Sequence, residues 1–128
     1  MPPHAQEEPG LDAIATADRV ARAAVLWLRR EVLHGGGALP GTRAHRELAA
    51  GLVARLGERL GLDRSQTLLA GYAVALLESE TDMAMDVPLR INAGAGTADY
   101  ARGVAAAESL FLMLTGAERA TDHAPGSA

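Results

Sequence analysis

The stretch that decides the fold is RAHRELAAGLVARLGERLGLDRSQTLLAGYAVALL, residues 43–77, in which two helical segments flank the short break GLDR at 61–64. The first segment is amphipathic, whereas the second is almost wholly apolar from Leu68 to Leu77. A helix that is apolar on every side has to be surrounded by other helices. We therefore predict a helical bundle with the second segment as its central member, although bundles serve many functions and this pattern names none.

The composition agrees with an all-α fold. The chain has 128 residues, of which 48% are apolar, so it is expected to form one domain with a real core. Its aromatic residues are one Trp, two Tyr and one Phe, so Ala, Leu and Val must build that core. No stretch alternates with the period of a strand. The predicted fold is a four-helix bundle with a short hairpin between helices two and three and a loop-rich crossing between helices three and four.

The charges and the missing cysteine narrow the class of protein. All twelve basic residues are Arg, and the formal net charge is −4. Residues 19–64 carry an excess of Arg and residues 65–128 an excess of acids. Such segregation can steer a partner or a second copy, unless packing mixes the signs on one surface. Without Cys there is no disulfide, thiolate zinc site or cysteine nucleophile. No signal peptide or membrane-length apolar run is visible, so a cytoplasmic location is expected.

The ends of the chain are predicted to lie outside the bundle, with a flexible arm at 1–11, the bundle at 12–116 and a flexible polar tail at 117–128. Asp12 is a candidate cap for a first helix at about 13–34. Its apolar stripe widens around Trp27, which indicates that the middle of this helix is either buried or faces a second chain.

Capping signals predict the second and third helices. Thr42 can cap a helix at 43–60, and Gly61 supplies a left-handed stop after it. Asp63 and Gln66 form a variant of the capping box at the start of the third helix.

The second half of the chain is predicted to contain two helices separated by a loop. The third helix should end somewhere between residues 80 and 85. Pro88 disfavours a helical Val87, so 86–92 is predicted to be extended or looped. Thr97 can cap a fourth helix that runs from 98 to about 114 and ends at Thr115-Gly116.

An acidic cluster is the strongest candidate for chemistry. If the third helix continues, Glu78, Asp82 and Asp86 stack on one face at four-residue intervals. Such carboxylates can hold Mg²⁺, and acids near a helix C-terminus oppose its dipole. A solvated helix end, neutralised by Arg90 or Arg102, is the favoured interpretation, and no cofactor is expected.

Two further motifs have ordinary explanations. The loop containing Gly94, Gly96 and Thr97 precedes a helix and could receive a phosphate, but it lacks the P-loop lysine, which favours a plain linker. Residues 53–72 could form a helix-turn-helix, but the second helix offers almost no polar side chains to read bases, and nucleic acid is therefore an unlikely partner.

A ligand pocket would involve Tyr72, whose hydroxyl is the one polar side-chain group in the apolar part of the third helix, together with Trp27 and Arg90. A buried Tyr bonded to a backbone carbonyl is the commoner arrangement. The histidines lack metal-ligand spacing and are expected to be structural or solvated: His4, His34, His45 and His123.

These observations predict a small intracellular protein that is regulatory or accessory, without catalytic activity, and that acts through protein–protein interaction. The apolar surface of the first and third helices exceeds what one small bundle buries, which favours a homodimer with Trp27 as the first candidate contact. The alternatives are a metal- or phosphate-dependent enzyme and a helix-turn-helix regulator.

Overall fold

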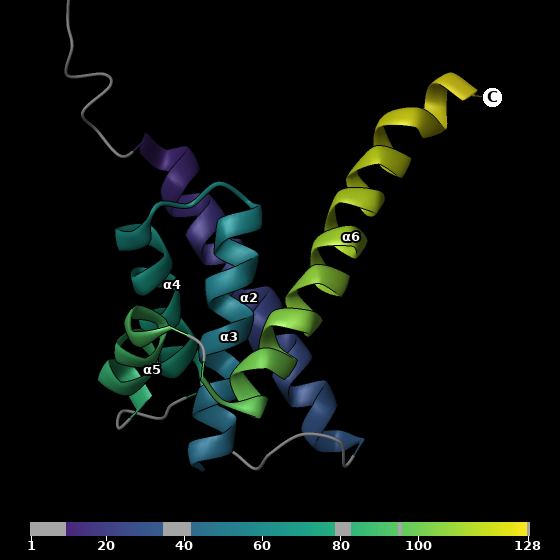
Figure 1. Cartoon of the computed structure of the whole chain (residues 1–128). Helices are drawn as coiled ribbons and strands as arrows, with labels where there is room; N and C mark the ends of the chain where they lie inside the picture. The colour runs from purple at the N-terminus through teal and green to yellow at the C-terminus, as the bar shows by residue number, and fades with distance from the viewer. Residues whose placement is uncertain (1–9, 35–41, 79–82, 95, 128) are drawn as a thin grey trace, which may run out of the picture.

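The computed structural model describes residues 10–34, 42–78, 83–94 and 96–127, with side chains described for 12–34, 42–78, 85–94 and 96–116. This part of the chain contains five helices and no strand, and the helices pack as a bundle (Figure 1). The all-α prediction is therefore confirmed. The helices are α2 (Gly10–Leu33), α3 (Arg43–Arg59), α4 (Arg64–Leu77), α5 (Met83–Ala93) and α6 (Ala98–Ser127).

The additional helix is α5, where the sequence predicted an extended or looped segment. Pro88 lies inside this helix, at a cost of about 3 kcal/mol relative to Ala. Val87 is fully buried and Ile91 packs against the core, and burying such side chains stabilises by roughly 1.5–3 kcal/mol each. The prediction was wrong because packing against α4 outweighs the local preference of the chain before proline.

The central helix is α3, and the prediction that the more apolar α4 would be central is wrong. α3 packs against α2, α4, α5 and α6, whereas the other helices have fewer neighbours. Its small side chains allow this close approach, and the charged residue Glu47 is buried as well. The buried residues of α3 are His45, Glu47, Leu48, Ala49, Ala50, Gly51, Leu52, Val53, Leu56 and Gly57.

The predicted caps around α3 and α4 are confirmed. The backbone N–H of His45 donates to the Thr42 hydroxyl at 3.2 Å, at the start of α3. Asp63 and Gln66 form the reciprocal capping box at the start of α4. Gly61 between them has φ +85°, a left-handed conformation that favours glycine.

The outer helices extend further than predicted. α2 begins at Gly10, so Asp12 lies in its first turn and is not its cap. α6 continues through Gly116, and its predicted end there is wrong. The Thr115 hydroxyl donates to the Phe111 carbonyl at 2.8 Å, which satisfies this polar group within the continuing helix. In Figure 1, α6 extends beyond the other helices toward its C-terminus.

Two glycines bring the backbones of α3 and α6 into close contact. A Cβ added to Gly51 would lie 2.1 Å from the Tyr100 carbonyl oxygen. A Cβ added to Gly103 would lie 2.2 Å from the Leu48 carbonyl oxygen. These helices therefore cross at a distance that only glycine permits at both positions.

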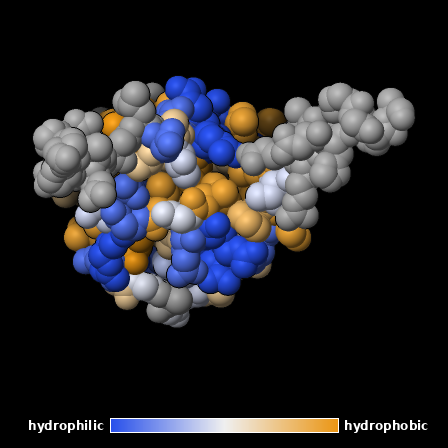
Figure 2. Space-filling model, turned by 90° about the horizontal axis from the view of Figure 1, so that it is seen from above, coloured by the Kyte–Doolittle hydropathy of each residue, from blue (hydrophilic) through white to orange (hydrophobic). Residues whose placement is uncertain are grey.

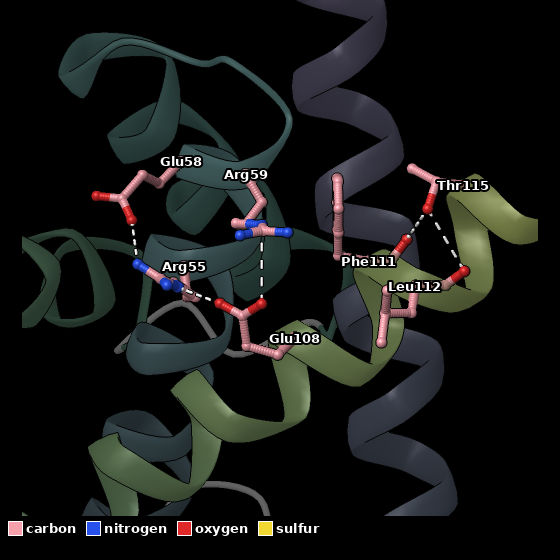
Figure 3. Close-up of polar contacts among 7 residues, drawn as sticks. All are labelled: Arg55, Glu58, Arg59, Glu108, Phe111, Leu112 and Thr115. Carbon is pink, nitrogen blue, oxygen red and sulfur yellow. Dashed lines mark hydrogen bonds and ion pairs between the residues drawn. The ribbon is translucent and has the colours of Figure 1, made fainter.

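Charged side chains join the C-terminal half of α3 to α6, as Figure 3 shows. Arg55 donates hydrogen bonds to Glu58 on its own helix and to Glu108 on α6, and Arg59 lies 3.7 Å from Glu108. The Arg59 guanidinium also lies 4.3 Å from the centre of the Phe111 ring. The hydrogen bond to Glu108 raises the pKa of Arg55 above its usual value. Along α6, the close backbone contact with α3 at Gly103 is thus followed by the ion pairs of Glu108 with Arg55 and Arg59.

Candidate functional site

The most prominent surface feature is a set of exposed leucine and isoleucine side chains on α2 and α4. Leu26 and Leu33 are seven residues apart on α2, and Leu69 and Leu76 are seven residues apart on α4, so each pair lies on one side of its helix. We define the α2–α4 face by its exposed apolar residues, which are between 37% and 82% exposed: Ile14, Leu26, Leu33, Leu69, Leu76 and Leu77.

The α2–α4 face has a hollow at each end. Both helices run in the same direction, because the start of α2 meets the start of α4 and the end of α2 meets the end of α4. The N-terminal hollow has a volume of about 340 Å³ and is lined by Ala13, Ile14, Ala17, Asp63, Ser65, Gln66 and Leu69. The C-terminal hollow has a volume of about 280 Å³ and is lined by Leu28, Arg29, Val32, Leu33 and Glu78. Their linings are mainly apolar, so water in them finds few hydrogen-bond partners, and an apolar side chain can replace it favourably.

Hydrophobic surface is also visible at one end of the bundle. Figure 2 views the end at which α2 begins and α3 passes into α4, and shows hydrophobic atoms in its middle bordered by hydrophilic residues. The N-terminal hollow lies at this same end, because Ala13 and Asp63 both line it. A contiguous apolar area with a polar border is typical of a surface that binds another protein.

Charged residues flank the exposed apolar stripe of α2. Asp18 accepts a hydrogen bond from Arg22 at 2.8 Å, and both side chains are more than half exposed. Arg29 lies at the edge of the C-terminal hollow. Asp18 and Arg29 are eleven residues apart, which is about three helical turns, so they lie on the same side of α2. Along this side of α2 an arginine-paired carboxylate therefore lies toward the N-terminal end, and Arg29 lies toward the C-terminal end.

A buried pair joins the start of α3 to the end of α4. His45 Nε2 lies 3.0 Å and 3.2 Å from the two carboxylate oxygens of Glu78, and both side chains are almost fully buried. A buried carboxylate requires such a partner. The two residues are 33 positions apart, and no local pattern in the sequence marks them as a pair.

A second polar cluster joins α5 to α3. Arg90 donates hydrogen bonds to Glu47 at 2.7 Å and to Asp86 at 2.8 Å, and Arg46 lies 3.5 Å from Asp86. The hydrogen bond to Asp86 raises the pKa of Arg90, although partial burial opposes this shift. Asp86 and Arg90 are four residues apart, a spacing that favours an ion pair within a helix. This spacing would have indicated the pair if α5 had been predicted to be helical.

The predicted continuation of the third helix is wrong, and with it the basis for stacking Glu78, Asp82 and Asp86. α4 ends one residue before Glu78, Asp86 lies on α5, and Asp82 lies outside the described residues. Glu78 binds His45 and Asp86 binds Arg90. Within the described ranges, no group of three or more His, Asp or Glu residues is placed to hold a metal ion.

The residues predicted to form a ligand pocket lie in different parts of the bundle. Trp27 lines an open groove of about 340 Å³ between α2 and α6, opposite Ala105 and Ala106. Arg90 is paired at the contact between α3 and α5. Tyr72 is 39% exposed on the outer side of α4, rather than inside the bundle as the sequence suggested.

The predicted phosphate loop forms the link between α5 and α6. Gly94 has φ +84°, and Gly96 has open space around it. The Thr97 hydroxyl accepts a hydrogen bond from the backbone N–H of Tyr100 at 3.1 Å, in the manner of an N-cap. The cap confirms the local prediction that Thr97 starts the last helix.

No helix in the described part of the chain is long and apolar enough to cross a membrane. No protein-family model, curated protein or solved structure matches the chain.

Proposed function

We propose that this protein is a small, non-catalytic interaction module, regulatory or accessory in role, that self-associates through the α2–α4 face. The observation that carries the proposal is the exposure of six large apolar side chains along two adjacent parallel helices. Exposed apolar surface costs about 25 cal/mol per Å² relative to burial. A contiguous face of this kind is therefore a favourable place for another protein to bind.

The size of the face is sufficient for a specific contact. A helix rises about 1.5 Å per residue and occupies a width of about 10 Å, so α2 and α4 together present a footprint of roughly 550 Å². Two copies would bury roughly 1,100 Å², which is below the roughly 1,200–2,000 Å² of stable complexes but above the roughly 1,000 Å² expected of a biological interface. This area predicts a weak, reversible association. The expected assembly is a symmetric dimer, because an isologous contact is the commonest way for one face to be buried.

Two alternatives have less support. A DNA-binding role for α3 and α4 would require polar side chains on the outer side of α4, where Leu69, Tyr72 and Leu76 are exposed. A metal- or phosphate-dependent enzyme would require charged groups available to a ligand. Glu78 and Arg90 instead neutralise other side chains of the same chain.

The test is the mass of the protein in sedimentation equilibrium at micromolar concentrations. The chain of 13.3 kDa should show a reversible monomer–dimer equilibrium. Leu76→Arg should shift it to monomer, since this half-exposed side chain lies on the face. Leu112→Arg is the matched control, because Leu112 is also more than half exposed but lies on α6.

Circular dichroism must first show that both variants keep their helices. A wild-type protein that stays monomeric up to hundreds of micromolar would refute self-association. Dissociation by Leu112→Arg with no effect of Leu76→Arg would place the contact on a different surface and refute the proposed face.

A further inference from the structure

We infer that two copies of the chain dock with their α2 helices antiparallel. The two-fold axis that relates them crosses α2 at the level of the Ala23–Ala24 peptide bond. This inference rests on the self-association proposed above. In this register Ile14 faces Leu33 of the second copy, and Asp18 faces Arg29 of the second copy. Each pair lies symmetrically about the same midpoint of α2. The face is therefore complementary to itself when reversed.

The hollows support this register. Leu33 is the most exposed large apolar side chain of the face, at 82%, and it stands beside the C-terminal hollow. Reversal of the second copy places its Leu33 over the N-terminal hollow and its Ile14 over the C-terminal one. Each hollow is mainly apolar and has a volume of roughly 300 Å³. An exposed side chain thus meets a hollow at both ends of the contact.

The charges of Asp18 and Arg29 favour the antiparallel arrangement over the parallel one. Parallel α2 helices would place Asp18 beside Asp18 and Arg29 beside Arg29, and like charges at close range repel. In the antiparallel arrangement both of these contacts join opposite charges. The two Arg22 side chains lie near the axis, where the charge of each is offset by the Asp18 of its own helix at 2.8 Å, and Asp18 can bind Arg29 of the second copy as well. Asp18 and Arg29 lie roughly 8 Å on either side of the midpoint, so a moderate crossing angle leaves them within reach.

A charge-reversal cycle tests the register, with the dimer dissociation constant as the readout. Asp18→Arg and Arg29→Asp should each weaken the dimer about tenfold, because two exposed pairs change from attraction to repulsion. The double variant should return to within about threefold of the wild type. A parallel dimer would respond differently, since each single change would only replace one like-charge pair by another.

The matched control combines Asp18→Arg with Arg30→Asp. Arg30 is the exposed neighbour of Arg29 on α2, so the net charge equals that of the first double variant. In the defined register position 30 pairs with Ala17 and not with Asp18, so this control should remain about tenfold weakened. Helical circular dichroism spectra must be unchanged in every variant.

The outcomes separate the two proposals. A monomeric wild type refutes self-association itself. A wild-type dimer whose single variants associate normally, or whose first double variant is not restored, refutes the antiparallel register while self-association stands. Equal restoration by the control would show that only net charge matters, and would also refute the register.

Discussion

The closest contact in the bundle gives a sharp prediction for Gly103→Ala. The added Cβ would lie 2.2 Å from the Leu48 carbonyl oxygen and 2.7 Å from the Leu52 amide nitrogen. Both atoms belong to the backbone of α3, so neither can rotate away, and α3 and α6 must separate. Overpacking costs about 1–3 kcal/mol, and a backbone collision belongs at the upper end.

The better helix propensity of Ala offsets about 1 kcal/mol of this cost. The net loss should therefore be about 2 kcal/mol, or a fall in Tm of roughly 8 °C for a domain of this size. Urea unfolding followed by circular dichroism measures it. Gly116→Ala is the matched control on the same helix, because nothing lies within 4 Å of its added Cβ. That variant should gain up to about 1 kcal/mol. A Gly103→Ala protein as stable as the wild type would show that the two helices do not cross this closely.

Three further predictions follow from the turn between α3 and α4, the buried tyrosine and the midpoint of α2. Gly61→Val should lose about 1 kcal/mol or more in urea unfolding, because Gly61 has φ +85° and a β-branched residue resists positive φ; an unchanged midpoint would contradict the turn. Burial, followed by the negative charge of Glu47, raises the pKa of Tyr100 in the folded protein. The contribution of Tyr100 to the free energy of unfolding is therefore complete below pH about 10 and is lost as the pH rises through the folded pKa. Tyr100→Phe should reduce the loss of stability measured above that pH. In this chain without Cys, Arg22→Cys lies near the midpoint of α2 and should cross-link two copies on mild oxidation, whereas Leu112→Cys should not.

Local signals in the sequence predicted local structure well. Thr42, the Asp63–Gln66 pair and Gly61 each act within a few residues, and the structure has each in the predicted role. Pro88 misled because its local preference opposed helix, while the energy that forms α5 comes from Val87 and other contacts with distant residues. Propensity is a weak guide where packing decides.

The arrangement of the helices needed information that the sequence pattern lacks. Apolar content alone favoured α4 as the central helix, but the centre is α3, whose small residues admit four neighbours. The His45–Glu78 pair joins residues 33 positions apart and has no periodic signal. The surplus of apolar surface on the first and third predicted helices was readable, and corresponds to the exposed side chains of α2 and α4.

The close crossing of α3 and α6 also has a consequence for synthesis of the chain. Gly51 and Gly103 are 52 residues apart, and translation at about 5–20 residues per second separates them by roughly 3–10 s. For most of that interval α3 is complete, but the surface around Gly51 has no α6 to cover it. The nascent protein therefore passes through a period in which a chaperone, or the α6 of a neighbouring copy, competes for that surface, and exchange of α6 between copies is the misfolding route that this topology favours.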